Sequence, residues 1–363
     1  MKLKQLIPIL KIMPFIVLVI WALSARLPYF SEIGKDINAY QRAIEELFSG
    51  KNPYEWTIKS FSNPDDPGNH GYSYLPGFLY LFGFLYAVAL KFPALDFQVL
   101  WKIPILLADL GVGFLLFKYL FKRDYLFSLA AAFVWFFNPF SMFRTGYTYV
   151  DPIPVLLLLV AMIFLEKDDV LAGATYALAV IFKTFPIALF PVFVLLSKNR
   201  IKFLAAGLIV SVAFAVPFMS NIETFTTFLN GSLLVHNERF VQGRPFLFYI
   251  SYYYNVELFQ ILPFQFYSLM SMFFGWVLVL IAYFIFKLKN KYILSLIALS
   301  NFFLFTPVLN RTYVLWLIPT LILGSYYLFK SKKLVYYLVV ILFHIFYSWY
   351  LLQWRDCFHI WRP

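Results

Sequence analysis

The sequence predicts a polytopic α-helical membrane protein, and three observations carry that prediction. Hydrophobic residues make up 62% of the 363 residues and charged residues 13%, whereas about a quarter of a soluble domain is charged. Long apolar runs recur from one end of the chain to the other. These runs lack the alternation of barrel strands, and a bilayer accepts only helices or closed barrels. We therefore expect an all-α fold in which residues 1–363 form a single integral-membrane domain.

The basic residues indicate how the chain crosses the membrane. Lysine and arginine gather in short clusters between apolar runs, at 2–4, 118–123, 198–202, 287–291 and 330–333. Because cytoplasmic loops are enriched in these residues, all five clusters are expected on the cytoplasmic side. The same distribution excludes nucleic acid as the partner, despite a net charge of +12.

About 11 transmembrane helices are expected from the apolar runs. They lie roughly at 8–28, 98–121, 125–141, 150–166, 169–182, 185–197, 201–219, 266–287, 292–308, 312–329 and 334–352. These spans place every basic cluster inside only if the apolar run 74–90 does not cross, so we expect that run to be interfacial or re-entrant. Residues 29–97 then form a first external loop with two interfacial helices, and residues 220–265 form a large external loop. The runs 169–182 and 185–197 are short for a bilayer of ~30 Å, which suits half-helices beside a cavity.

The first external loop opens with an amphipathic pattern. Apolar residues recur at helical spacing at Ile37, Tyr40, Ile44, Leu47 and Phe48. This pattern predicts a helix in the membrane interface that ends at Gly50 and the Asn52-Pro53 turn. Asp36 stands at its start and has two interpretations. It is either a catalytic base at the membrane surface or an N-cap of this helix.

Three charged residues fall at or near membrane depth, where charges are costly. Asp109 lies within an expected span and suits either a helix–helix ion pair or direct chemistry. Asp151 precedes Pro152 at a helix start, so capping competes with a functional role. Lys183 has no obvious local partner, which favours anion binding, although snorkelling to the interface also explains it.

Further cations are expected on the external side. His236, Arg239 and Arg244 lie in the large external loop, where they suit a phosphate group or are simply solvated. Arg311 opens an apolar span on the external side, against the charge rule. With a single cysteine and four scattered histidines, the sequence predicts no dedicated zinc site. It also contains no Walker, GxSxG, HExxH or GxGxxG motif.

Several sequence blocks together resemble a known group of enzymes. They are Asp36…Tyr40…Gly50-Lys-Asn-Pro-Tyr54, Tyr72-Ser-Tyr-Leu-Pro76, Ile105-Leu-Leu-Ala-Asp109, Asn138-Pro139…Gly146…Asp151, Lys183-Thr-Phe-Pro186, His236…Arg239…Arg244 and Tyr313-Val-Leu-Trp316. In order and spacing these blocks resemble the C-superfamily (GT-C) glycosyltransferases that use polyprenyl-phosphate sugars. They are most similar to glycosylphosphatidylinositol mannosyltransferase I and to the mannosyltransferases of glycosyltransferase family 87. One departure is Gly34, which stands where mannosyltransferase I has the first acid of its Asp-x-Asp pair.

The resemblance implies inverting transfer of a sugar, in the first place mannose. The donor would be a dolichyl- or polyprenyl-monophosphate sugar, and the acceptor a hydroxyl of a lipid-linked molecule or glycan on the extracellular or lumenal face. Asp36 would be the base, and Asp151, Tyr40 and Tyr313 would orient the substrates. The donor phosphate would be bound by Lys183, Arg239, Arg244, Arg311 and His236. No cofactor is required, and the participation of a divalent metal is left open. The alternatives are a flippase for a lipid-linked sugar and a non-catalytic subunit of a glycosylation complex.

Overall fold

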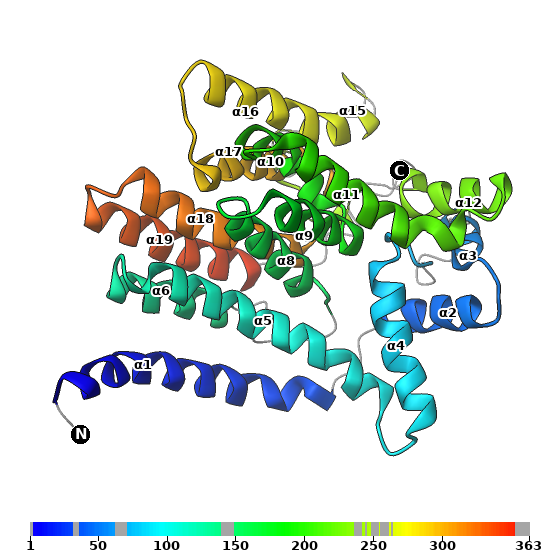
Figure 1. Cartoon of the computed structure of the whole chain (residues 1–363), viewed down its shortest axis with the longest axis horizontal. Coiled ribbons are helices and arrows are strands. Elements are labelled where there is room, and N and C mark those ends of the chain that lie inside the picture. The colour runs from blue at the N-terminus through cyan, green and yellow to red at the C-terminus, as the bar shows by residue number, and fades with distance from the viewer. Residues whose placement is uncertain are drawn as a thin grey trace.

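The computed structural model describes residues 3–31, 36–61, 71–138, 149–235, 242–243, 245–247, 254, 261–262 and 264–352. These residues are mostly helical, and Figure 1 shows a bundle of long helices with a group of shorter helices at one end. The described residues include one short parallel strand pair, formed by β1 (Gln242–Gly243) and β2 (Val308–Leu309). The all-α expectation is therefore confirmed apart from this two-residue pairing.

Each of the expected apolar spans contains a helix. The first half of the bundle is built from α1 (Leu3–Arg26), η1 (Leu27–Ser31), α5 (Phe97–Phe121), α6 (Tyr125–Phe136), α8 (Pro152–Phe164) and α9 (Asp169–Phe182). The second half comprises η2 (Phe185–Leu189), α10 (Phe190–Leu196), α11 (Arg200–Ala215), η3 (Val216–Phe218), α15 (Phe264–Leu269), η5 (Met270–Phe274), α16 (Gly275–Phe284), α17 (Lys291–Phe305), η6 (Arg311–Tyr313), α18 (Val314–Leu328) and α19 (Lys333–Leu352).

Fewer helices than expected are long and apolar enough to cross a membrane. In the described part of the chain, four segments are long and apolar enough to cross: Leu10–Phe30, Phe97–Phe121, Arg200–Phe218 and Gln265–Phe284. The other apolar helices have 10–17 residues. Helix α9, with 14 residues, extends only about 21 Å at 1.5 Å per residue. The expectation of 11 spanning helices is therefore not confirmed.

The helix starts follow from short polar side chains in the sequence. Side-chain oxygens of Asp96, Asp124, Asp168, Asn199, Asn221 and Asn290 accept backbone N–H groups in the first turns of the helices that follow them. Such caps satisfy donors that the helix itself leaves unpaired, and each contributes about 1 kcal/mol. Much of the polar content between the apolar runs therefore serves to begin helices.

A buried ion pair joins α1 to α5. Arg26 Nε donates to Asp109 Oδ2 at 2.8 Å, and both side chains are at most 2% exposed. Arg26 Nη2 also donates to the Phe136 carbonyl at 2.6 Å, and Trp135 Nε1 donates to the Asp109 carbonyl at 2.9 Å, so α6 takes part as well. The helix–helix interpretation of Asp109 is thus confirmed.

Helices α9 and α11 approach each other closely at a glycine. A Cβ added to Gly173 would lie 2.1 Å from the backbone oxygen of Phe203. Gly207 of α11 faces the same contact, with the Gly173 carbonyl oxygen 3.5 Å from a built Cβ. Small residues at a helix contact let the backbones approach and pack by van der Waals contact. This contact fixes α11 beside α9 and leaves the opposite side of α11 exposed, including Ile201 and Ile209.

A second group of helices lies at the end of the molecule where α1 ends (Figure 1). It contains α2 (Asp36–Phe48), α3 (Pro53–Phe61), α4 (Gly77–Lys91) and α12 (Ile222–Ser232). In Figure 1, α4 runs across the direction of α1 and α5. Gly50 ends the turn after α2 with φ of +76°, in the left-handed region that suits glycine.

The apolar face of α2 packs on protein. Ile37, Tyr40 and Ile44 are buried in one cluster with Phe78, Phe82 and Trp101 of α4 and α5, while Phe48 stays exposed. The amphipathic pattern of α2 predicted a helix lying in the membrane interface. The structure shows that most of its apolar face covers α4 and α5, because the aromatic residues of those helices present a matching apolar surface.

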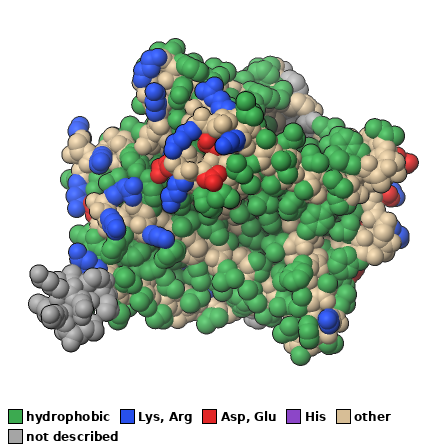
Figure 2. Space-filling view, viewed as in Figure 1, with side chains coloured by type: hydrophobic (Ala, Val, Ile, Leu, Met, Phe, Trp, Pro, Cys, Tyr) green, Lys and Arg blue, Asp and Glu red, His purple; other side chains and the backbone are tan. Residues whose placement is uncertain are grey.

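Lysine and arginine side chains gather at the opposite end of the molecule, over the turns that join the bundle helices (Figure 2). Lys333 pairs with Asp124 at 3.1 Å, which joins the basic cluster 330–333 to the turn between α5 and α6. Lys291 pairs with Glu166 at 2.8 Å, and Lys198 Nζ donates to the Glu166 carbonyl at 3.1 Å. The clusters 118–123, 198–202, 287–291 and 330–333 therefore share one end, as the topology argument requires.

Candidate functional site

The candidate site is organised by the hairpin of α8 and α9. These helices have nearly equal length and are joined by a short turn, so the start of α8 lies beside the end of α9. Asp151 stands at the first of these positions and Lys183 at the second. Lys183 Nζ donates to Asp151 Oδ1 at 2.7 Å, and both side chains are almost completely buried.

This pairing bears on two expectations. Lys183 has no partner nearby in the sequence, but the hairpin brings it to an acid 32 positions away. Asp151 does occupy the N-cap position of α8, but its side chain makes no capping hydrogen bond. Its Oδ1 atom accepts from Lys183, and its Oδ2 atom is buried without a hydrogen-bond partner among the described residues. The carboxylate therefore pairs with the lysine and does not cap helix α8.

The backbone leaves the helix at Lys183. Its φ and ψ of −157° and 140° are extended, and the 3₁₀ turn η2 starts two residues later. This break turns the lysine side chain toward the interior. Burial lowers the pKa of Lys183, but the Asp151 carboxylate and the nearby Tyr74 and Tyr313 raise it by more, so the net pKa lies above the ordinary lysine value. The ammonium group is therefore charged at neutral pH.

Aromatic rings surround the ion pair. Trp316 Nε1 donates to Asp151 Oδ1 at 2.6 Å, which joins α18 to the hairpin. The Trp316 ring stacks between Phe185 and Tyr313, at centroid separations of 3.9 and 4.1 Å. Lys183 Nζ lies 5.0 to 5.6 Å from the ring centroids of Tyr313, Trp316 and Tyr74, close enough for cation–π attraction.

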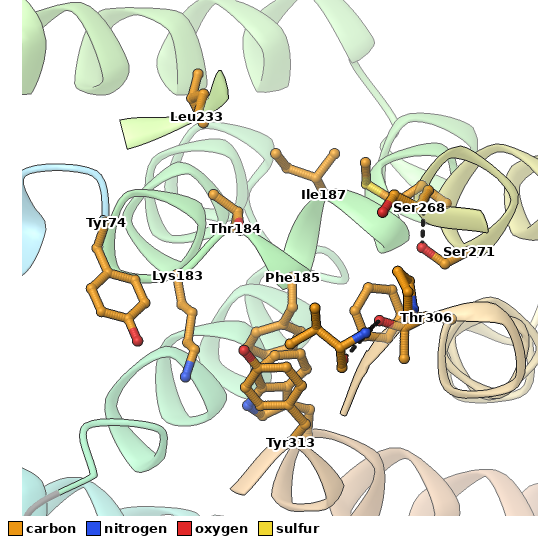
Figure 3. A pocket seen from close by; sticks show the side chains of 15 residues that line it. Tyr74, Lys183, Thr184, Phe185, Ile187, Leu233, Ser268, Ser271, Thr306 and Tyr313 are labelled. Atoms are coloured by element: carbon orange, nitrogen blue, oxygen red, sulfur yellow. Dashed lines mark hydrogen bonds between the residues drawn. The ribbon is translucent and has the colours of Figure 1, made fainter. Parts of the chain in front are cut away.

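A cavity of about 350 Å³ opens beside this group. Figure 3 shows Tyr74 and Tyr313 on either side of the Lys183 side chain, which points between them. Away from the lysine, the cavity wall becomes apolar at Ile187, Leu233, Met272 and Phe302. The cavity therefore offers a cation at one part of its wall and a hydrocarbon-like surface at another, which suits an amphipathic ligand with an anionic group.

One wall of the cavity contains an unusual helical turn. Residues Met270–Phe274 form a π-helical turn between α15 and α16. The Asn301 amide of α17 donates to the carbonyls of Met270 and Ser271, at 3.0 and 2.9 Å. Ser271 and Met272 line the cavity. Such π turns occur often at functional sites, and here the turn shapes the wall facing the lysine.

The first-loop helices reach the cavity through tyrosines. Tyr40 of α2 stacks on Tyr74 at a centroid separation of 5.8 Å, and Tyr74 lies beside Lys183. Tyr40 itself is 5% exposed and does not line the cavity, so it supports Tyr74. Asp36 is the first residue of α2, one helical turn before Tyr40. Its side chain lies outside the described part of the structure, so its role as a base stays a prediction.

Most of the other predicted cations are also outside the described residues. His236, Arg239 and Arg244 belong to this group, and Arg311 is described as part of η6 without its side chain. Among the predicted residues, the structure thus brings together Asp151, Lys183 and Tyr313. It adds three residues that the sequence reasoning did not assign: Tyr74, Phe185 and Trp316. The i, i+3 spacing of Tyr313 and Trp316 was the available signal, because it puts both rings on one face of a helix.

Among the described residues, no group of three or more histidine, cysteine or acidic side chains is arranged to hold a metal ion. The chemistry that the described site itself offers is a buried ammonium donor, a carboxylate that fixes it, and aromatic surfaces beside an amphipathic cavity.

Comparison with known proteins gives one match. The family model for glycosyltransferase family 87 matches residues 72–308. This range includes α4, α5, the α8–α9 hairpin and the π turn. No match was found among curated proteins or solved structures. The family model covers well over half of the chain and includes both members of the buried ion pair, and on this evidence the protein belongs to glycosyltransferase family 87.

Proposed function

We propose that this glycosyltransferase moves mannose from a dolichyl- or polyprenyl-monophosphate carrier to a hydroxyl of a lipid-linked or glycan acceptor, with inversion at C1 and with the GT-C type of fold. Family membership establishes that the chain is a glycosyltransferase with a sugar donor and an acceptor. The observation that supports the lipid-phosphate donor is the position of Lys183, where an amphipathic cavity carries a buried cation on an otherwise largely apolar wall. A nucleotide-sugar donor has no hydrocarbon chain to occupy the apolar part.

The proposed reaction requires stabilisation of the leaving phosphate. The bond from C1 of the sugar to the phosphate oxygen breaks, and the phosphate gains negative charge as the acceptor oxygen bonds to C1. Lys183 has three N–H donors, of which one points to Asp151. The others are available to phosphate oxygens. Because Asp151 already balances the charge of Lys183, further cations are needed, and we assign that role to Arg239, Arg244, Arg311 and His236.

The acceptor hydroxyl must lose its proton as it attacks the face of the sugar opposite the phosphate. We assign this proton to Asp36. Two observations support the assignment: Asp36 begins α2, and α2 reaches the cavity through the Tyr40–Tyr74 stack. Asp151 is a poorer candidate, because its buried Oδ1 atom already accepts from both Lys183 and Trp316. Asp151 and Tyr313 instead orient the lysine and the bound substrate.

We also propose that transfer occurs on the non-cytoplasmic face. The basic turns gather at one end of the molecule (Figure 2), and the first-loop helices α2 and α4, which adjoin the cavity-lining Tyr74, lie at the other end (Figure 1). If the basic end is cytoplasmic, as the charge rule predicts, the α2 end faces the extracellular or lumenal side. The flippase alternative has less support, because family membership assigns glycosyl transfer to this chain.

The test is transfer by the purified full-length protein. It is incubated in detergent or liposomes with polyprenyl-phosphate mannose and a lipid-extract acceptor, and the product is identified by mass spectrometry. We expect transfer by the wild-type protein and loss of at least about 100-fold in the Asp36→Asn variant, as is typical when a general base is removed. The matched control is Asp96→Asn, because Asp96 is an exposed acid that caps α5 and asparagine preserves caps.

Two results would contradict the proposal. Full activity of Asp36→Asn would exclude this residue as the base. Transfer from a nucleotide sugar, with none from any lipid-phosphate sugar, would exclude the donor class. A Lys183→Gln variant separates the two roles further, because we expect weaker use of the lipid donor while the KM for the acceptor stays unchanged.

A further inference from the structure

The basic end of the molecule is hollowed between two turns. A cavity of about 450 Å³ lies where the turn between α5 and α6 meets the turn between α18 and α19. Its wall includes Arg123, Asp124, Leu126, Lys330, Lys333 and Tyr336. This cavity, which we call the turn cavity, shares no lining residue with the cavity beside Lys183. It therefore needs a separate explanation.

The acid in the turn cavity is already fully engaged. Asp124 Oδ1 accepts from the Phe127 amide and from the Tyr337 hydroxyl, at 3.1 and 3.0 Å. Its Oδ2 atom accepts from the Tyr336 hydroxyl at 2.6 Å and pairs with Lys333 at 3.1 Å. These partners leave Asp124 with no free oxygen. It can neutralise Lys333 and cannot serve the two remaining cations.

Arg123 and Lys330 are those remaining cations. Both side chains are exposed, and within the described residues neither forms an ion pair. The Arg123 guanidinium is held in place, because it lies over the Tyr119 ring at 4.0 Å and donates to the Tyr119 carbonyl. An ordered guanidinium loses less conformational freedom when it binds an anion, and arginine binds phosphate through two parallel hydrogen bonds.

A second cavity extends the positive charge. It has a volume of about 420 Å³, and its wall includes Tyr119, Tyr327 and three lysines, Lys198, Lys289 and Lys291, with Glu166 as the one acid among its lining residues. The hydroxyl groups of Tyr119 and Tyr327 lie 2.6 Å apart, so the tyrosine beneath Arg123 also forms part of this second wall. Arg123 lines the turn cavity and Tyr119 lines the second cavity, so their contact connects the two walls. Together they create a field that attracts anions.

Exposed leucines lie next to the charged residues of the turn cavity in the sequence. Leu126 lines the cavity and is 62% exposed. Leu328 and Leu334, which flank the turn that carries Lys330, are 53% and 71% exposed. A soluble anion needs only the cations. A phospholipid also needs an apolar surface next to them, where its acyl chains can leave the head-group site along the bundle.

We propose that the turn cavity binds the phosphate group of an anionic phospholipid from the surrounding leaflet, through Arg123 and Lys330. The acyl chains then lie along the exposed leucines of α6, α18 and α19. This site is independent of sugar transfer. Basic pockets between membrane helices bind anionic head groups in this way, and the turn cavity has the required charge, volume and nearby exposed leucines.

The test is lipid binding to the full-length protein, measured by native mass spectrometry with titrated phosphatidylglycerol and phosphatidylcholine. We expect phosphatidylglycerol to bind in preference. The Arg123→Gln/Lys330→Gln variant should bind it about thirtyfold more weakly, which corresponds to about 2 kcal/mol at 1.4 kcal/mol per tenfold. Lys333 is left unchanged, so its pair with Asp124 is preserved. The control is Lys51→Gln/Lys59→Gln, which removes two exposed lysines from the α2–α3 end.

Each outcome decides the proposal. Equal binding of the two lipids, or equal losses in the two double variants, would overturn it, because the effect would then be one of net charge. Displacement of phosphatidylglycerol by soluble glycerol 3-phosphate at equal concentration would also overturn it, since the acyl chains would then contribute nothing. Selective loss in the Arg123→Gln/Lys330→Gln variant, with unchanged unfolding in lipid-free detergent, supports it.

Discussion

The buried pair of Lys183 and Asp151 makes a quantitative prediction about stability. Lys183 is 6% exposed and Asp151 is 1% exposed, and their charged atoms lie 2.7 Å apart. Removal of one member leaves the other charge buried without compensation, which costs about 3–5 kcal/mol. We therefore expect Lys183→Met and Asp151→Leu each to lower the free energy of unfolding by that amount.

The double variant Lys183→Met/Asp151→Leu should lose less than the sum of the two single losses. It removes both charges together and leaves Trp316 Nε1 as the one hydrogen-bond donor of this group without its acceptor. We expect a coupling energy of about 2–3 kcal/mol, at the upper end for directly contacting residues. The measurement is unfolding of all four proteins by SDS in mixed micelles, followed by circular dichroism.

A second ion pair serves as the control for this cycle. Lys291 and Glu166 lie 2.8 Å apart, but Glu166 is 56% exposed. Solvent screens such a pair, so the cycle Lys291→Met/Glu166→Gln should give a coupling energy of at most about 1 kcal/mol. Single losses under 1 kcal/mol at Lys183 and Asp151, additive in the double variant, would refute the reasoning.

Three other changes test the packing and the electrostatics of the fold. Arg26→Met should lower the free energy of unfolding by about 3–5 kcal/mol, because it leaves Asp109 buried and charged, and Arg26→Met/Asp109→Leu should recover part of that loss. Both variants are measured by SDS unfolding, and an Arg26→Met variant as stable as the wild type would contradict the prediction. Gly173→Ala should lower the free energy of unfolding by more than about 2 kcal/mol, because its Cβ would lie 2.1 Å from the Phe203 carbonyl oxygen. Gly207→Ala should lower it by less than about 1 kcal/mol. Equal losses in the two variants would count against the close approach of α9 and α11. Burial raises the pKa of Asp124, but hydrogen bonds from Tyr336, Phe127, Lys333 and Tyr337 together lower it by a larger amount, so the net pKa lies below the ordinary value. Its charge therefore stabilises the fold above about pH 4, and this stabilisation is lost as the pH falls through the pKa of the folded state. Asp124→Asn should lower the free energy of unfolding by about 1 kcal/mol at pH 7 and by progressively less below about pH 4, as measured by thermal unfolding across that range. A difference that does not depend on pH would contradict the assignment.

Local patterns in the sequence were sufficient to predict the helices of the apolar runs, but not α3 and α12, which lie in the expected external loops. The apolar runs and the short polar residues before them gave the positions of α5, α6 and α9, because a helix and its cap depend on neighbours within one turn. The first-loop helix and its end at Gly50 could be predicted for the same reason. Whether a helix spans the bilayer depends also on its length, tilt and neighbours, and for that reason the count of 11 crossings could not be derived from hydropathy.

The contacts of the site were harder to predict. Arg26 and Asp109 are separated by 83 positions, and the sequence gives no indication that a residue near the end of one helix meets the middle of another. The pair of Asp151 and Lys183 was within reach, because two helices of similar length joined by a tight turn bring their far ends together. The role of Trp316 was not, since its hydrogen bond to Asp151 depends on how α18 packs against the hairpin.

The end of helix α9 at Lys183 has a further consequence, which concerns helix dipoles. Asp151 stands at the N-terminal end of α8, where the aligned peptide dipoles present partial positive charge, and Lys183 stands at the C-terminal end of α9, where they present partial negative charge. Each side chain therefore has the sign that its own helix end favours. The reversed pair, Asp151→Lys with Lys183→Asp, would restore the mutual attraction but oppose both dipoles, so the polarity of this hairpin is not interchangeable.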